Sequence, residues 1–170
     1  MSGAADIAPV LAALWPAGGE RNEAYAVLDG ARDRRIEALL RIWGLEHVCL
    51  YGEAIGPELR NAAPFLVRLE RGGETTEQLI ERAWGNAWGV FAVAPAGTGM
   101  RAVTRHCRRL LRVLDERGEV MLFRYYDPRV MRMFGSLSTP EQLATFLRNT
   151  PAWIFEASDS QVKQLSHLDT

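Results

Sequence analysis

The sequence predicts a single α/β domain of three layers, in which helices flank a mixed, mostly parallel sheet. Three observations favour this class. Apolar runs of strand length alternate with helix-like segments along 170 residues, and two or three connections read as helical crossovers. The run at 90–94 is continuously apolar, as expected of a strand with both faces buried. A hydrophobic share of 48% and a charged share of 24% are typical of one globular domain.

The N-terminal half is expected to contain a lead-in helix, three strands and one longer helix. Residues 1–24 form the lead-in, with a helix over 6–15, and the first strand over 25–28 ends at Asp29-Gly30. This pair can turn the chain and cap the next helix. Apolar residues at helical spacing predict that helix over 36–43, with Gly44 at its C-terminal end. The other two strands are predicted at 47–51 and 65–69, with a short helical turn between them at 57–60.

The next part of the chain is expected to hold two helices and two strands. Thr75 and Gln78 have the spacing of a capping box, which begins a helix before the buried strand at 90–94. The clearest helix spans about 100–114, where apolar residues through Leu114 face inward and arginines take the other side. A further strand is predicted over 119–126.

Two helix starts and one strand complete the domain, which we place at 25–155. Asp127 and Pro128 have the order of an N-cap followed by a first-turn proline, and the apolar stripe of their helix ends at Leu137. The segment at 139–142 repeats this pattern and starts a second helix. A short strand at 153–155 precedes a polar C-terminal tail at 156–170. A weak amphipathic helix in the tail would use Val162, Leu165 and Leu168.

Charge and cysteine content argue against several classes of protein. Twenty basic and 21 acidic residues leave a formal net charge of −1, which argues against a general nucleic-acid binder. No stretch approaches the about 20 apolar residues of a membrane span, and the first residues do not read as a secretory signal. Cys49 and Cys107 lie among apolar residues and form no C-x-x-C pair. We therefore expect reduced core cysteines in a cytoplasmic protein.

No catalytic residue, metal site or cofactor is predicted. His47, His106 and His167 show no metal-ligand spacing, and the sequence has no nucleophile elbow. The loop from Gly97 to Gly99 follows a strand and precedes a helix, so it could cradle an anion. A small α/β enzyme or a nucleotide-binding protein built on this loop is therefore an alternative function.

Charge is unevenly distributed along the chain. Residues 101–132 hold nine arginines and four acids, whereas residues 46–81 hold seven acids and three arginines. An arginine row lies on the outer side of the helix predicted at 100–114 and comprises Arg101, Arg105, Arg108, Arg109 and Arg112. This row is either a solvated helix face or a docking surface for an acidic segment of a partner protein.

Several short motifs follow one another in a characteristic order. The most specific is Phe123-Arg124-Tyr125-Tyr126-Asp127-Pro128-Arg129-Val130. The others are Val27-Leu28-Asp29-Gly30-Ala31, Leu50-Tyr51, Ala63-Pro64-Phe65-Leu66-Val67-Arg68-Leu69, Trp88-Gly89 and Arg105-His106-Cys107-Arg108-Arg109-Leu110. From about 25 to 155 this series resembles the effector adaptor and chaperone domain of bacterial type VI secretion, long described as a domain of unknown function.

The resemblance implies a non-enzymatic protein of the bacterial cytoplasm. It would bind a toxic effector, through the effector's N-terminal segment, and help to load it onto the VgrG spike of the secretion machine. We expect an exposed apolar strand edge or groove to supply the affinity. No cofactor, metal, membrane or nucleic-acid partner is implied. Many members of that family carry a further helical lobe, where this sequence has the polar tail. An immunity-like or purely structural partner protein is the remaining alternative.

The residues that carry the resemblance are expected to be structural first. Asp127 and Pro128 would start a helix that holds Arg129 beside Arg124, and Asp29 is a candidate ion-pair partner of one of these arginines. The motif residues are Asp29, Gly30, Tyr51, Pro64, Trp88, Arg124, Tyr126, Asp127, Pro128 and Arg129.

Overall fold

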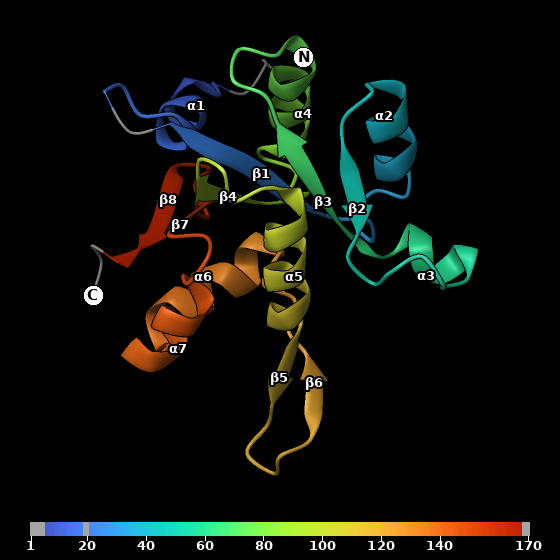
Figure 1. The fold of residues 1–170 in the computed structure, drawn as a ribbon, viewed down its shortest axis with the longest axis vertical. Coiled ribbons are helices and arrows are strands. Elements are labelled where there is room, and N and C mark those ends of the chain that lie inside the picture. The colour runs from blue at the N-terminus through green and yellow to red at the C-terminus, as the bar shows by residue number, and fades with distance from the viewer. Residues whose placement is uncertain (1–5, 19–20, 168–170) are drawn as a thin grey trace.

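A six-stranded sheet runs through the computed structural model, which describes residues 6–18 and 21–167 (Figure 1). In spatial order its strands are β2 (His47–Cys49), β3 (Pro64–Leu69), β1 (Asn22–Asp29), β4 (Gly89–Pro95), β7 (Ala152–Glu156) and β8 (Val162–Ser166). Every neighbouring pair in this order is antiparallel. The chain is α/β, but the predicted mostly parallel sheet is wrong.

The antiparallel order arises from the way the helical crossovers are arranged. Strands β1 and β2 both pair antiparallel with β3, so these two strands, joined by a helix, run in the same direction. The same holds for β3 and β4, which both pair with β1. Each crossover therefore joins two parallel strands that are not neighbours in the sheet. The strand between them is antiparallel to both: β3 lies between β1 and β2, and β1 lies between β3 and β4. Local patterns predict a crossover, but they do not reveal the inserted strand.

Helices cover both faces of the sheet. One face packs against α1 (Ala8–Leu14), α2 (Ile36–Ile42) and α4 (Glu74–Ala83), and the other against α5 (Met100–Leu110), α6 (Pro128–Leu137) and α7 (Pro140–Phe146). Along β1, Ala26 and Leu28 face the first group, whereas Tyr25 and Val27 face the second. The continuous apolar runs thus reflect a sheet that is buried on both sides. The short helix α3 (Pro57–Asn61) is largely exposed.

Three predicted helix ends are confirmed. The Asp127 carboxylate accepts a hydrogen bond from the backbone N–H of Arg129 at 2.9 Å, so Asp127 caps α6. Thr139 and Gln142 form a reciprocal capping box at the start of α7. Gly44 follows α2 with a φ of +65°, the left-handed conformation expected after a helix.

Two predicted caps are wrong. Helix α4 begins at Glu74, so Thr75 lies inside its first turn and does not cap it. Helix α2 begins only at Ile36, too far along the chain for Asp29 to cap it. The Asp29 carboxylate instead accepts the backbone N–H of Ala31 at 3.0 Å, which turns the chain at the end of β1.

The predicted helix at 100–114 and the predicted strand at 119–126 are both too long. Helix α5 ends at Leu110, and the chain then forms a separate hairpin of β5 (Arg112–Leu114) and β6 (Val120–Leu122). The side chain of Leu114 is exposed and does not face inward. The apolar spacing around Leu110 fits a helix and a strand equally well, and the hairpin turn at Gly118 decides between them.

The segment at 156–170 contributes β8, which pairs with β7 at the edge of the sheet. A strand at 153–155 is confirmed as part of β7, but the weak helix expected in the tail is wrong. Val162 and Leu165 pack on opposite faces of the sheet. Residues three positions apart share a face in a helix but lie on opposite faces of a strand, so this spacing belongs to a strand here. Leu168 lies outside the described residues.

The core contains both cysteines, as expected. Cys49 and Cys107 are free and buried, and burial raises the pKa of the Cys107 thiol to about 12. No helix in the described part of the chain is long and apolar enough to cross a membrane.

Candidate functional site

The β5–β6 hairpin projects from the domain (Figure 1). It carries a concentration of exposed apolar side chains. Its exposed apolar residues are Val113, Leu114, Val120, Met121 and Leu122. Val113 lies opposite Met121, and Leu114 lies opposite Val120, so each face of the hairpin carries an apolar pair. A two-stranded hairpin alone is marginally stable in water, and a contiguous apolar patch of this kind is typical of an interaction surface.

The turn of the hairpin is held by specific hydrogen bonds. The Asp115 carboxylate accepts the backbone N–H groups of Arg117 and Glu119, each at 2.8 Å. Gly118 has a φ of +79°, which favours glycine at this position of the turn. At the base, the N–H of Phe123 donates to the carbonyl of Leu111 at 2.7 Å. The hairpin therefore presents its apolar strands with a defined geometry.

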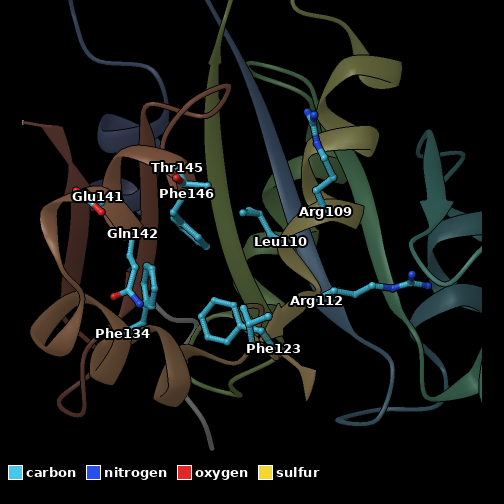
Figure 2. Close-up of a pocket in the computed structure, with 10 residues that line it drawn as sticks. Arg109, Leu110, Arg112, Phe123, Phe134, Glu141, Gln142, Thr145 and Phe146 are labelled. Atoms are coloured by element: carbon cyan, nitrogen blue, oxygen red, sulfur yellow. The ribbon is translucent and has the colours of Figure 1, made fainter. Parts of the chain in front are cut away.

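One face of the hairpin borders a hollow of about 380 Å³, which extends to α6 and α7 (Figure 2). Three aromatic rings form its wall. The ring centroid of Phe134 lies 5.1 Å from that of Phe123 and 4.8 Å from that of Phe146. Glu141 and Gln142 of α7 supply polar groups on one side of the hollow, and Arg109 and Arg112 line the other side (Figure 2).

A second hollow of about 360 Å³ continues the first along α6. Phe123, Phe134 and Val113 line both hollows, which we name together the α6–α7 groove. Met133 and Leu137 line its outer end, and the side chain of Leu137 is 79% exposed. The prediction that Leu137 lies on the buried stripe of this helix is therefore wrong. The groove thus has a lining of aromatic and exposed aliphatic side chains, with charged and polar groups around its first hollow.

The opposite face of the hairpin borders a cleft of about 600 Å³, which extends to β2 and α3. We name it the arginine cleft, because Arg108, Arg109 and Arg112 line it. Leu59 and Leu122 supply exposed aliphatic groups to the cleft. Among the described residues that line it, none is acidic.

The structure places the predicted arginine row on the exposed side of α5 and at the start of β5. Arg101 and Arg105 lie on the same helix as the cleft arginines but outside the lining of both hollows. Within residues 6–18 and 21–167, none of the five arginines forms an ion pair. Their role in binding a partner stays a prediction.

The motif residues gather at one end of the sheet. Because β1 runs antiparallel to β3 and β4, its end meets the start of both strands. Asp29 lies opposite Pro64, and the N–H of Asp29 donates to the carbonyl of Trp88 at 2.7 Å. A Cβ atom at Gly30 would lie 2.6 Å from the carbonyl oxygen of Ala63. This close backbone approach accounts for the glycine.

The predicted ion pair of Asp29 is confirmed, and its partner is Arg124. The guanidinium of Arg124 donates to the Asp29 carboxylate at 2.6 Å. The Asp29 side chain is fully buried, whereas that of Arg124 is 44% exposed. Arg129 pairs with Asp127 at 2.7 Å, next to the proline that opens α6. These charges tie the 123–130 motif to the sheet and to its own helix.

Two tyrosines complete the cluster. The Arg124 guanidinium lies 5.8 Å from the ring centroid of Tyr126, within cation–π range. The hydroxyls of Tyr126 and Tyr51 are 3.3 Å apart. Burial, together with this hydrogen bond, raises the pKa of Tyr126, so it is neutral at physiological pH. The cluster is consistent with the structural role that we expected first.

The Gly97–Gly99 loop already holds a carboxylate of the chain itself. The backbone N–H groups of Gly97 and Gly99 donate to the Glu23 side chain at 3.0 and 2.8 Å. Partial burial opposes the charge of Glu23, but hydrogen bonds from Tyr25 and these amides hold its pKa below the ordinary value. An external anion would have to displace Glu23. The described residues also contain no cluster of three or more metal-binding side chains.

Sequence reasoning missed the hairpin and the α6–α7 groove. Short apolar runs were assigned to the core, because large apolar residues are usually buried. One signal could have identified the hairpin: two apolar runs flank Asp115-Glu116-Arg117-Gly118, a turn sequence that ends in glycine. The exposure of Leu137 had no comparable signal, because its spacing fits the buried stripe of α6.

The comparisons with known proteins give one match. The family model described as "Domain of unknown function (DUF4123)" matches residues 24–145, more than two thirds of the chain. The match includes the motif cluster, α5, the hairpin and α6. No curated protein and no solved structure matches the chain.

Proposed function

The chain belongs to the DUF4123 family, and from this premise we propose that it is a non-enzymatic adaptor or chaperone for a type VI secretion effector. The family is associated with such effectors. In the proposed role, the protein binds the effector's N-terminal segment in the bacterial cytoplasm and helps to load it onto the VgrG spike. No step of this function needs a catalytic residue, a metal or a cofactor.

The observation that carries the proposal is the exposed apolar hairpin beside the α6–α7 groove. Val113 and Met121 on one hairpin face, with Met133 and Leu137 on α6, offer aliphatic contacts that the chain itself leaves in water. Burying a fully exposed side chain of this kind contributes about 1.5–3 kcal/mol, and these four are between 40% and 79% exposed. A partner that covers several of them would therefore gain substantial affinity.

The shape of the groove favours an amphipathic helix of the effector as the occupant. The groove runs along α6 and is walled by rings that are themselves half-buried or buried, so apolar anchors on one side of a helix could enter it. Polar groups at the rim, such as Gln142 and Glu141, can hydrogen-bond the helix's polar side.

The test is titration calorimetry of the purified chain with a purified type VI effector from the same bacterium. We compare the wild type with Leu137→Asp, Met121→Asp and the matched control Ile42→Asp. Ile42 is 77% exposed on α2, which packs on the opposite face of the sheet. We expect Leu137→Asp and Met121→Asp to weaken binding by about tenfold or more, and Ile42→Asp to leave it unchanged.

VgrG is added in a second step. Size-exclusion chromatography should show a complex that contains the effector and VgrG together only when the adaptor is present. An effector that binds neither the wild type nor any variant contradicts the adaptor role. Equal binding by all variants assigns the effector to another surface.

A further inference from the structure

We infer that the arginine cleft is a second docking surface, which binds an acidic protein segment with aliphatic anchors while the α6–α7 groove is occupied. The inference rests on the proposed function only for the identity of the occupant of the groove. Its own support comes from the charge, the apolar walls and the position of the cleft.

The charge of the cleft is positive and uncompensated. Arg108, Arg109 and Arg112 line it, and no acidic side chain does so among the described residues. On the α3 side, two carboxylates are already engaged, since Glu37 and Glu53 both pair with Arg60. A carboxylate from a partner would therefore meet free guanidinium groups.

Arg108 is held in place without being neutralised. Its side chain donates to the carbonyl of Cys49 at 3.1 Å and to that of Leu50 at 3.3 Å, both at the end of β2. A guanidinium has five N–H donors, so donors remain after these two bonds. Carbonyl oxygens orient the group but carry no net charge. Arg108 is thus prepositioned for a charge-assisted hydrogen bond to a carboxylate.

The walls of the cleft select a protein segment and not a polyanion alone. Leu59 on α3 and Leu122 on β6 are each about half exposed and line the cleft with Ile55 and Leu111. Nucleic-acid binders combine arginines with stacked aromatic platforms, whereas Tyr51 is the aromatic side chain that lines this cleft among the described residues. A protein segment in which acidic residues alternate with leucine-like residues could pair with the arginines and also contact the aliphatic walls.

The position of the cleft allows two partners at once. The hairpin register places Arg112 and Leu122 as one opposed pair and Val113 and Met121 as the next, so the two pairs point to opposite faces. In Figure 2 the guanidinium ends of Arg109 and Arg112 extend away from the ring of Phe123. Arg109 and Arg112 line both the cleft and the groove, whereas Arg108, Leu59 and Leu122 line the cleft alone among these hollows. The hairpin is therefore a wall between two adjoining surfaces, and Arg108 and Leu59 are the residues that distinguish the cleft.

Fluorescence anisotropy tests the inference with a labelled peptide of alternating glutamate and leucine. A peptide of equal length, with lysine in place of glutamate, controls for charge. The variants are Arg108→Gln and Leu59→Asp. Their matched controls are Arg105→Gln, on the same helix outside the cleft, and Ile42→Asp. Leu59 lies on the exposed helix α3, so its replacement tests the cleft even if Arg108→Gln disturbs β2.

We expect the wild type to bind the acidic peptide in preference to the lysine peptide. Arg108→Gln should weaken binding about tenfold, the loss expected for one charge-assisted hydrogen bond. Leu59→Asp should weaken it by a similar factor, about tenfold, because it removes an apolar contact and places a negative charge against the acidic peptide. The controls should not weaken binding. Leu137→Asp should leave peptide binding intact, and so should saturation with effector. Absence of peptide binding, equal loss in Arg105→Gln, or stronger binding of a single-stranded oligonucleotide would overturn the inference. Apart from the saturation experiment, none of these measurements needs the effector, so the two proposals fail separately.

Discussion

The ion pair between Asp29 and Arg124 makes a sharp prediction about stability, because its two members are buried unequally. The Asp29 side chain is fully buried, whereas that of Arg124 is 44% exposed. Replacing Arg124 by alanine leaves a buried carboxylate with the Ala31 N–H as a remaining donor. Replacing Asp29 by asparagine leaves a guanidinium that water can reach.

The magnitudes follow from this difference. Removing one partner of a buried ion pair lowers the free energy of unfolding by about 3–5 kcal/mol. Because water can enter the half-exposed site that Arg124 leaves, Arg124→Ala should fall at the low end of this range, at about 3 kcal/mol. Asp29→Asn keeps the shape and can still accept the Ala31 N–H, so it should cost about 1 kcal/mol. The double variant contains no buried charge at this site. It should therefore be more stable than Arg124→Ala alone.

Urea unfolding followed by tryptophan fluorescence measures these values, since the chain has five tryptophans. With a slope near 2 kcal/mol per molar, Arg124→Ala should lower the midpoint by about 1.5 M. Restoration of part of that loss by Asp29→Asn is the decisive result. If the two substitutions cost the same, or if their costs add in the double variant, Asp29 does not carry a buried charge that Arg124 compensates.

Three further predictions concern single residues. Gly89→Ala should cost about 3 kcal/mol or more in urea unfolding, because its Cβ would lie 2.1 Å from the Val27 carbonyl oxygen in the neighbouring strand. Burial opposes the charge of Asp127, but hydrogen bonds from Arg129 hold its pKa below the ordinary value. Its contribution should be present above about pH 4 and disappear in more acidic solution, where Asp127→Asn and the wild type should unfold alike. Burial lowers the pKa of His106, so folding stability should fall as the pH drops below about 6.5, and His106→Gln should flatten that dependence.

The sequence predicts local features correctly where a short motif is compatible with a single local structure. The caps at Asp127 and Thr139 depend on side chains next to the backbone groups they satisfy, so no tertiary information is needed. An ion pair of Asp29 with Arg124 or Arg129 was also predicted, from the place of Asp29 at the end of the first strand, and the structure identifies Arg124 as the partner. The arginine row was visible as a local excess of charge.

The order of the strands in the sheet could not be predicted in the same way. The insertion of β1 between β3 and β4 depends on pairing between segments distant in sequence, and crossover helices look alike in parallel and split arrangements. The spacing of the apolar residues after Leu110 fits a helix. These residues form a hairpin instead, because Gly118, with its positive φ, allows the chain to turn. For the same reason the apolar surface of the candidate site was assigned to the core.

Amide hydrogen exchange of the free chain and of its effector complex tests the central claim most directly. We expect rapid exchange across the hairpin at 112–122 in the free chain, since its strands are short and exposed. On binding, exchange should slow there and along α6, while the amides of α2 stay unchanged. Protection confined to α2, or to the edge strand β8, with the hairpin still exchanging rapidly, would contradict the claim that the hairpin and the α6–α7 groove bind the effector.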